Sequence, residues 1–240
     1  MRTEPHIAQL RAAQTDSRTW KMAKVVAVVS GGMDSATLLY HMLDAGHQCW
    51  AISVDYGQRH VKELDYARQL CAGVNVPHQV ADLSAINPIF GENSLSGRQM
   101  EVPEGHYAEE SMKQTVVPNR NMLLLSVAIA WAASNKCAAV AYGAHSGDHA
   151  IYPDCRPEFA DAMDAAARLC DWNPIELWRP FVHMDKGEIA QRGVQLGVPY
   201  EKTWTCYKGL EKHCGKCGAC VERKEAFTTN GLIDPTDYAS

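Results

Sequence analysis

Apolar residues occur along this chain in two recurring patterns, short continuous runs and longer stretches with helical spacing. The first run, residues 24–30 (KVVAVVS), is rich in β-branched residues, as expected of a strand that is buried on both faces. Two glycines follow, and a helical stretch then extends over residues 34–45, opened by an aspartate, a residue that favours helix starts. The same patterns predict the remaining elements: strands over residues 48–54, 78–83, 137–143 and 175–181, and helices over residues 63–72, 122–134, 157–170, 186–196 and from about 221.

Strands and helices alternate in this order, which predicts an α/β fold with a mostly parallel sheet and helices on both faces. The pattern breaks down over residues 84–112, where Gly, Pro, Asn, Ser and Glu dominate, and a loop of this length is usually functional or mobile. We predict one α/β domain over residues 24–200, a small cysteine-bearing segment over residues 201–240, and a non-catalytic N-terminal extension over residues 1–23.

Composition and charge exclude several classes of protein. The 240 residues, of which 46% are hydrophobic and 21% charged, suit one large domain with its own core. A net charge of −5 argues against a broad nucleic-acid-binding surface, which is usually basic. No apolar run approaches the roughly 20 residues of a membrane helix, and residues 1–23 contain no apolar signal core. We therefore predict a cytoplasmic protein with no membrane segment and no stable nucleic-acid partner.

A glycine-rich loop, SGGMDS at residues 30–35, joins the first predicted strand to the first helix. Ligands of open parallel sheets bind beyond the carboxyl ends of the strands, and backbone N–H groups at a helix start attract anions. The glycines let the backbone approach a phosphate, the serines offer hydroxyl donors, and Asp34 suits Mg2+ or a role in fixing the loop. A tight turn without a ligand is the alternative, but the complete string favours a phosphate site. The Walker lysine and the dinucleotide fingerprint are absent, which excludes a P-loop kinase.

Two further polar strings occur where a ligand of such a sheet would lie. Residues 55–60 (DYGQRH) follow the second strand, and there Arg59 and His60 could face phosphates or a carboxylate, although a solvated surface turn has the same composition. Residues 117–121 (VPNRN) lead into a helix, and Arg120 stands near its start, where anions gather.

The cysteines predict a metal site. Of nine cysteines, five are scattered and four are clustered near the C-terminal end, a distribution typical of metal ligands in a reducing compartment. Pairs separated by two residues form a tight knuckle around a tetrahedral ion, and four protein ligands leave no open position for catalysis. An iron–sulfur cluster uses the same ligands and is the alternative to structural zinc. The predicted ligands are Cys206, Cys214, Cys217 and Cys220.

The SGGMDS loop resembles that of the PP-loop ATP pyrophosphatase superfamily, whose members activate a carbonyl or carboxyl oxygen by adenylation. The DYGQRH and VPNRN strings, residues 152–159 (YPDCRPEF), residues 203–207 (TWTCY) and the cysteine cluster resemble, more specifically, the 7-cyano-7-deazaguanine synthase family. This resemblance implies an adenine-nucleotide α-hydrolase-like (Rossmann-like) nucleotide-binding domain with a small C-terminal zinc-binding segment. One departure is Asn119, where many relatives carry Gly, although Asn also tolerates left-handed backbone geometry.

The resemblance implies a two-stage reaction that consumes ATP. ATP with Mg2+ would adenylate the carboxylate of 7-carboxy-7-deazaguanine, and ammonia would displace AMP to give the amide. A second activation would convert the amide into the nitrile, 7-cyano-7-deazaguanine. Because this chemistry needs no electron transfer, zinc is preferred to an iron–sulfur cluster. No glutaminase domain is visible, so ammonia is expected free or from a partner, and a homodimer is the family expectation.

The resemblance also implies the residues of the site. For ATP it implies Val29, Ser30, Gly31, Gly32, Met33, Asp34, Ser35, Asp55, Tyr56, Gly57, Gln58, Arg59 and Arg120. For the substrate it implies His60, Asp148, Tyr152, Asp154, Arg156 and Phe159. Among these, an aromatic ring would stack on the base, an acid would accept from its N–H donors, and Arg156 would bind its carboxylate, unless Phe159 belongs to the core. The predicted catalytic residues are Asp34, Arg120 and Arg156; Cys155 is not expected to act as a nucleophile, because ATP already supplies the activation.

Three alternatives stay open. A relative could stop at the amide, the halfway product of the same site. A PP-loop tRNA-modifying enzyme would want a basic surface and often a catalytic cysteine pair, which fits this acidic chain poorly. A zinc-bearing regulatory or nucleic-acid-binding module would bind DNA or RNA with a steep salt dependence and would not turn over ATP; the phosphate loop counts against it.

Overall fold

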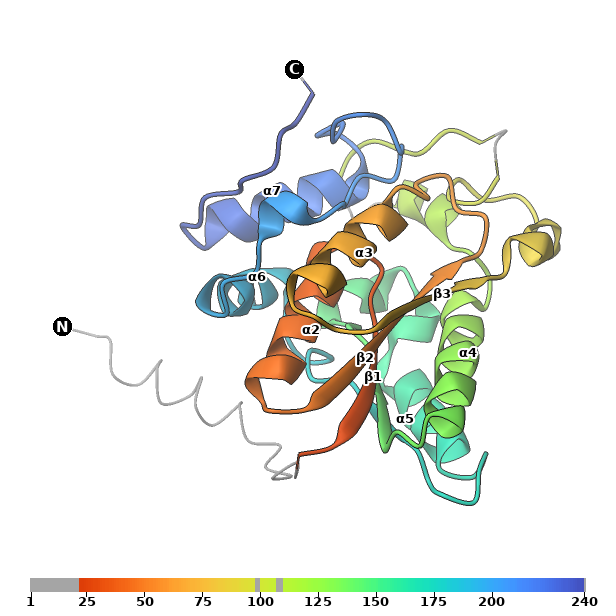
Figure 1. Ribbon diagram of the computed structural model, residues 1–240. Coiled ribbons are helices and arrows are strands. Elements are labelled where there is room, and N and C mark those ends of the chain that lie inside the picture. The colour runs from red at the N-terminus through yellow and green to blue at the C-terminus, as the bar shows by residue number, and fades with distance from the viewer. Residues whose placement is uncertain (1–21, 98–99, 107–109, 240) are drawn as a thin grey trace.

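The computed structural model describes residues 22–97, 100–106 and 110–239 (Figure 1). Residues 1–21, nearly all of the predicted N-terminal extension, lie outside the described residues. Within the described chain, five parallel strands form one sheet in the order β3-β2-β1-β4-β5. The strands are β1 (Lys24–Val28), β2 (Gln48–Asp55), β3 (His78–Asp82), β4 (Ala139–Ala141) and β5 (Glu176–Trp178). The α-helices are α2 (Met33–Asp44), α3 (Glu63–Gly73), α4 (Arg120–Ser134), α5 (Pro157–Ala167), α6 (Lys186–Gln195) and α7 (Gly218–Thr229).

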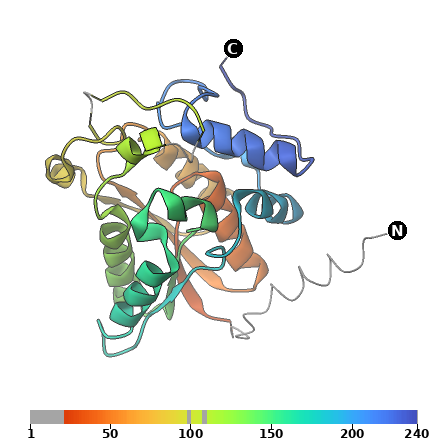
Figure 2. The same ribbon diagram turned by 180° about the vertical axis from the view of Figure 1, so that it is seen from behind.

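Alternate residues of β1 face opposite layers of helices, because successive side chains point to opposite faces of a strand. Val25 and Ala27 pack with α2, α3 and α6 on one face, whereas Val26 packs with α4 and α5 on the other, and all three are fully buried. The two helical layers can be followed from the front in Figure 1 and from behind in Figure 2. The predicted parallel sheet with helices on both faces is confirmed.

The last two strands differ most from their predicted lengths. β4 and β5 have three residues each, and both are shorter than the apolar runs that predicted them. The ladder between β1 and β4 pairs only Ala139 to Ala141, and β5 pairs with the same three residues of β4. The apolar residues beyond β4 pass into the loops at the carboxyl edge of the sheet.

Residues 84–112, predicted as an irregular loop, contain local order. Short 3₁₀ helices cover Ser84–Phe90 and Glu110–Thr115. Between them Asn93 is buried, and its Oδ1 accepts the backbone N–H groups of Leu95 (3.1 Å) and Ser96 (2.8 Å). An asparagine that bonds its own downstream backbone stabilises a tight turn, which hydrophobic periodicity does not report.

Residues Ser111–Ser134 are long and apolar enough, by length and composition alone, to cross a membrane. The sequence pattern did not single them out, because Lys113 and Arg120 interrupt the apolar run. In the structure this stretch is divided between a 3₁₀ helix and α4, and α4 buries residues such as Leu125 and Ile129 against the sheet. Such a segment is weak evidence for a membrane span, because the core helix of a folded domain passes the same test.

The C-terminal helix α7 carries a fully buried arginine. Arg223 donates to Thr203 Oγ1 (2.7 Å) and to the carbonyl of Tyr200 (3.0 Å), and it pairs with Asp234 at 3.2 Å. Near it, Phe227 packs α7 onto the layer formed by α2, α3 and α6. Arg223 therefore holds the chain that leads into the cysteine cluster against α7. The domain boundary predicted at residue 200 stays a prediction.

We expect the substitution Arg223→Leu to lower the free energy of unfolding by about 3–5 kcal/mol, because it leaves the carboxylate of Asp234 without its buried partner. Denaturant unfolding followed by circular dichroism measures this loss. Arg68→Ala is the matched control: it removes an exposed ion pair with Asp65, and we expect a change below about 1 kcal/mol. Equal effects of the two substitutions would contradict the role given to Arg223.

Candidate functional site

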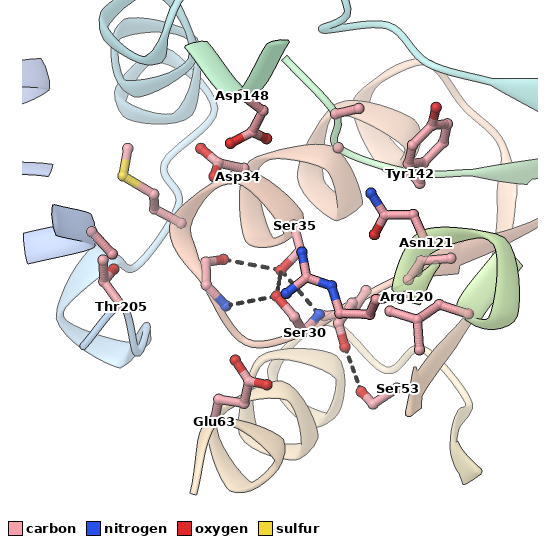
Figure 3. A pocket seen from close by; sticks show the side chains of 18 of the residues that line it. Ser30, Asp34, Ser35, Ser53, Glu63, Arg120, Asn121, Tyr142, Asp148 and Thr205 are labelled. Atoms are coloured by element: carbon pink, nitrogen blue, oxygen red, sulfur yellow. Dashed lines mark hydrogen bonds between the residues drawn. The ribbon is translucent and has the colours of Figure 1, made fainter. Parts of the chain in front are cut away.

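A cavity opens at the carboxyl edge of the sheet, where the ends of β1, β2 and β4 meet (Figure 3). Loop 30–35 forms one side of it, and the start of α4, the residues after β4 and residues 204–207 form the others. Of the predicted ATP-site residues, those that line the cavity are Val29, Ser30, Gly32, Met33, Asp34, Ser35, Tyr56 and Arg120; of the predicted substrate residues, His60, Asp148 and Tyr152 do so.

The phosphate loop is held by its own hydroxyl groups and by a close approach to α3. The N–H of Ser30 donates to Ser35 Oγ (3.1 Å), and Ser35 Oγ donates to the carbonyl of Gly32 (3.0 Å). Gly31 has a φ of +92°, and a Cβ added to it would lie 2.2 Å from the carbonyl oxygen of Glu63, so only glycine fits. Because α2 begins at Met33 on the cavity wall, the positive end of its dipole serves this loop.

Asp34 belongs to a half-buried cluster of charged side chains that the sequence alone did not predict. Its Oδ2 accepts from Lys186 Nζ at 2.8 Å, and Lys186 also lies 3.0 Å from Glu222 and 3.3 Å from His145 Nε2. Burial alone would lower the pKa of Lys186. The negative charges of Asp34 and Glu222 outweigh that effect and raise the pKa above its ordinary value, so the amine stays charged. Burial raises the pKa of Glu222 against the opposing effect of Lys186. Among the described residues, Asp34 Oδ1 is buried without a hydrogen-bond partner.

Part of this cluster had a signal in the sequence. Lys186 is the first residue of α6, and a lysine in the first turn opposes the helix dipole, which marks it as unusual. Glu222 comes from α7 and His145 from the residues after β4. Glu222 and His145 are far apart in the chain, and only the tertiary fold brings them to Lys186. The sequence pattern therefore could not have shown that they meet.

Arg120 begins α4, and its guanidinium enters the cavity (Figure 3). Its neighbours are mainly tyrosines: it lies 5.8 Å from the ring centre of Tyr152, and Tyr56 and Tyr207 are also close. No carboxylate of the described chain forms an ion pair with it. The preceding Asn119 has a φ of +59°, the left-handed geometry that asparagine was expected to tolerate. A cation in a cavity, without a carboxylate partner, can bind an incoming anion.

A buried polar group lies beside the loop, built from the DYGQRH string and the first turn of α3. Gln58 Nε2 donates to Glu63 Oε1 (3.1 Å), and His60 Nε2 lies 3.6 Å from Glu63 Oε2. Burial, assisted by Arg120, lowers the pKa of His60 to about 3, so the imidazole is neutral. Burial raises the pKa of Glu63 to about 8 against Gln58 and Arg120. Glu63 was not predicted, since an acid at a helix start has an ordinary stabilising role.

Several predicted ATP-site residues support the cavity from outside its lining. Besides Gln58, Asp55 Oδ1 accepts the N–H of Gly57 (2.9 Å), which shapes the turn after β2. Arg59 donates to the carbonyls of Gly97 (2.8 Å) and Met100 (2.7 Å). Its guanidinium therefore anchors the long loop, and the structure does not bring it to the phosphate loop.

Three predicted substrate residues also lie outside the cavity lining. Asp154 accepts a backbone N–H in the first turn of α4 (2.9 Å), Arg156 is exposed and donates to a backbone carbonyl (2.9 Å), and Phe159 packs against the core. The cause is the 3₁₀ turn Pro153–Cys155, which redirects the chain after Tyr152. Asp154, Arg156 and Phe159 therefore lie outside the cavity lining, although they are close in sequence to Tyr152, which lines it.

Cys155 does line the cavity, but its environment opposes nucleophilic chemistry. Its thiol is buried, and burial raises its pKa well above the ordinary value. Asn121 Nδ2 lies 3.1 Å from its sulfur. Because the thiolate is the reactive form, this cysteine is a poor nucleophile.

The four clustered cysteines converge on one point. Their Sγ atoms all lie within 4.8 Å of one another, and all four residues are buried. Metal–sulfur bonds of about 2.3 Å in a tetrahedron separate the sulfurs by about 3.8 Å, so this set can close on a single ion. The N–H of Cys217 points at Cys214 Sγ (3.2 Å) and the N–H of Cys214 at Cys206 Sγ (3.4 Å), as expected of sulfurs that carry charge.

Two hydrogen bonds of Trp204, one from its backbone and one from its side chain, join the cysteine cluster to the phosphate loop. The N–H of Trp204 donates to the carbonyl of Gly31 (2.8 Å), and its indole N–H donates to the carbonyl of Cys206 (2.8 Å). On the other side of the cluster, Glu104 forms an antiparallel bridge with Cys217. The clustered cysteines are therefore connected to the phosphate loop through Trp204 and to residues 100–106 through Glu104.

Comparisons with known proteins identify the family. The family model described as queuosine biosynthesis protein QueC matches residues 24–231. A 7-cyano-7-deazaguanine synthase of Pseudoalteromonas translucida is 56% identical over 215 residues, which cover 90% of this chain and 98% of the relative. The same-named protein of Methanoregula boonei is 53% identical over 215 residues, with 90% and 99% covered. The chain belongs to the QueC family.

A solved structure shares the fold of this QueC-family chain. NMN synthetase from Francisella tularensis has a TM-score of 0.51 and 17% identity, and the match covers 95% of this chain and 86% of that one. At this identity the likeness concerns the fold alone. It agrees with the adenine-nucleotide α-hydrolase-like sheet predicted from the motifs.

We expect the purified QueC-family chain to hold about one metal ion, because four convergent thiolates complete a tetrahedral shell. Cys220→Ser should lose most of that ion and some thermal stability, since metal binding and folding are coupled. Metal analysis by mass spectrometry and thermal unfolding measure both. Cys170→Ser, at an exposed cysteine outside the cluster, is the control and should keep the ion. Metal retained in full by Cys220→Ser would contradict the assignment.

Proposed function

We propose that this protein converts 7-carboxy-7-deazaguanine, ATP and ammonia into 7-cyano-7-deazaguanine through an adenylated carboxylate and an amide. The observation that carries the proposal is that one cavity holds the phosphate loop together with Arg120, Asp148 and Tyr152, so that a triphosphate and a planar anionic base can meet. Family membership supports the same substrate, because relatives that match over nearly their whole length are named for this product.

Asp34 is the proposed Mg2+ ligand. Its buried Oδ1, which accepts no hydrogen bond from the described residues, is the kind of oxygen that Mg2+ prefers, and it lies beside the loop that would hold the phosphates. Bound there, Mg2+ would offset the charge of the leaving pyrophosphate. Lys186 holds the other carboxylate oxygen at 2.8 Å and so fixes its orientation.

Arg120 is the proposed partner of the negative charge that moves during adenylation. The substrate carboxylate attacks the α-phosphorus of ATP, and pyrophosphate departs. A fixed cation beside this transfer stabilises the transition state without reorganisation. Arg120 can do so directly, because it does not first have to break an ion pair with a carboxylate of the described chain. Arg156, which was predicted to bind the substrate carboxylate, is exposed and lies outside the cavity lining, so we propose that Arg120 also binds that carboxylate; a contribution of Arg156 stays a prediction.

The base of the substrate is proposed to lie between Tyr152 and Asp148. The ring of Tyr152 is held by a hydrogen bond of 2.5 Å between its hydroxyl group and Thr115, which suits a fixed stacking surface. Asp148 is a carboxylate that can accept from the ring N–H and amino groups of a deazaguanine. The neutral imidazole of His60 adds a further polar contact on the wall.

Zinc is the metal proposed for the cysteine cluster, in a structural role. Four sulfurs within 4.8 Å of one another suit a single ion and leave little room for a cluster of several iron atoms. We propose residues 201–240 as a metal-bearing segment that walls the cavity through Trp204. A homodimer, the source of ammonia and a cytoplasmic location stay predictions.

The first test is mass spectrometry of a reaction that contains the pure protein, ATP, Mg2+, ammonium and 7-carboxy-7-deazaguanine. We expect the nitrile to form, and Asp34→Ala to reduce its rate by about a hundredfold or more, since it removes the oxygen ligands proposed for Mg2+. Asp161→Ala, an exposed carboxylate of α5, is the matched control and should keep the wild-type rate.

Each product pattern has a distinct meaning. Amide without nitrile would keep the first stage and place this chain in an amide-forming branch. No product, from protein that holds its metal and binds ATP, would contradict the substrate assignment and favour a tRNA-modifying PP-loop enzyme.

A further inference from the structure

Glu63 presents a carboxyl group to the cavity at the side of the phosphate loop. It is the first residue of α3, its side chain is only 12% exposed, and its carbonyl oxygen touches Gly31 (Figure 3). Oxygen Oε1 accepts from Gln58 (3.1 Å). Oxygen Oε2 lies 3.6 Å from His60, too far for a hydrogen bond, and no other donor of the described chain reaches it. One carboxylate oxygen is thus held and the other is available to the cavity.

The other acidic or basic groups of the cavity are less suited to accept a proton. Asp34 already accepts from Lys186 and is the proposed Mg2+ ligand. Asp148 lies 3.5 Å from His145 and near the ammonium group of Lys186, and it is the proposed acceptor of the N–H groups of the substrate base. His60 resists protonation because it is buried near Arg120. Glu63 does not belong to the charged cluster around Lys186, and its printed partners are Gln58 and His60.

The proposed reaction requires a proton acceptor at this place. Ammonia enters with all of its N–H bonds, and the nitrile nitrogen has none, so every proton must pass to a base. We propose that the carboxylate of Glu63 removes the protons from the reacting nitrogen, an inference that rests on the proposed function. A positioned base contributes about 10²–10⁴-fold to such steps.

Each stage of the proposed reaction releases protons and one AMP. The lone pair of ammonia forms a bond to the acyl carbon, a proton passes from the new ammonium nitrogen to Glu63, and the bond between carbon and the AMP oxygen breaks. In the second stage ATP adenylates the amide oxygen, and pyrophosphate leaves. Both remaining N–H protons then depart, one at a time through Glu63 to water, as the bond to AMP breaks and the carbon–nitrogen triple bond forms.

The surroundings of Glu63 tune it for this task. Burial raises its pKa to about 8, Gln58 and Arg120 lower it, and Asp55 at the end of β2 raises it. A base with a pKa near the working pH combines a useful population of carboxylate with a strong pull on the proton. Because the raised pKa leaves Glu63 mostly protonated at neutral pH, the rate should rise with pH by up to about tenfold per unit and level off above about 8. The negative charge of a bound triphosphate would raise that midpoint.

The test separates adenylation from proton removal. Exchange of pyrophosphate into ATP, with 7-carboxy-7-deazaguanine and no ammonium, reports adenylation alone. Conversion of pre-formed 7-amido-7-deazaguanine into the nitrile reports the second stage, and it is free of the ionisation of ammonium. For Glu63→Gln, which keeps the shape of the side chain, we expect exchange within about twofold of wild type and nitrile formation slower by about a hundredfold or more.

Two further variants serve as a control and as a partial rescue of the carboxylate. Asp65→Asn changes an exposed carboxyl group of the same helix and should leave both rates unchanged. Glu63→Asp withdraws the carboxylate by one methylene and should restore part of the nitrile rate, which a purely structural role for the side chain would not predict.

The outcomes are distinguishable. Nitrile formation at the wild-type rate by Glu63→Gln would overturn the inference, and so would equal loss of exchange and nitrile formation, because the carboxyl group would then serve adenylation. If the variant does not fold, the wild-type pH profile from the amide decides: a flat profile from about pH 6 to 9 overturns the role, and a rise supports it. Absence of exchange in the wild-type protein would remove the proposed function, and this inference with it.

Discussion

The arrangement of the site depends on the close contact at Gly31. Its Cα lies against the carbonyl of Glu63, its own carbonyl accepts from Trp204, and its φ of +92° is one that a side chain would resist. Through this one residue the phosphate loop is packed onto α3 and bonded to the chain beside the cysteine cluster. The loop therefore owes its shape to α3 and to the chain beside the cysteine cluster as well as to its own hydroxyl groups.

The cavity contains two cations with different surroundings. Lys186 is enclosed by Asp34, Glu222 and His145, so its charge is compensated inside the protein. Arg120 has tyrosines around it instead. A buried charge without a partner costs stability, and positions of this kind are common where a protein binds a charged ligand. Near Asp34, the positive charge of Lys186 is thus balanced by carboxylates of the protein. Near Arg120, the positive charge is not balanced in this way, so this side of the cavity favours anions.

Local features of the sequence predicted most of the fold and part of the site. The apolar run of β1 and the helical spacing of α2 located the phosphate loop, and the short cysteine spacing predicted four cysteines whose sulfurs converge in the structure, because each of these depends on neighbours in sequence. Arg156 and Phe159 were grouped with Tyr152 because they are close in the chain, but a single 3₁₀ turn directs them elsewhere. Glu222 and Lys186 meet only after α6 and α7 have packed, and no local pattern encodes that meeting.

The strand order also has a consequence for synthesis of the chain. β1 lies at the centre of the sheet, with β2 and β3 on one side and β4 and β5 on the other. The ribosome produces the first side early, whereas β4 follows only after the long loop and α4 have been made. A nascent chain that folds as it emerges would therefore carry half a sheet, with the second edge of β1 open and its apolar faces partly bare. During that interval the chain would expose more apolar surface than the completed fold does, and would be more prone to aggregate.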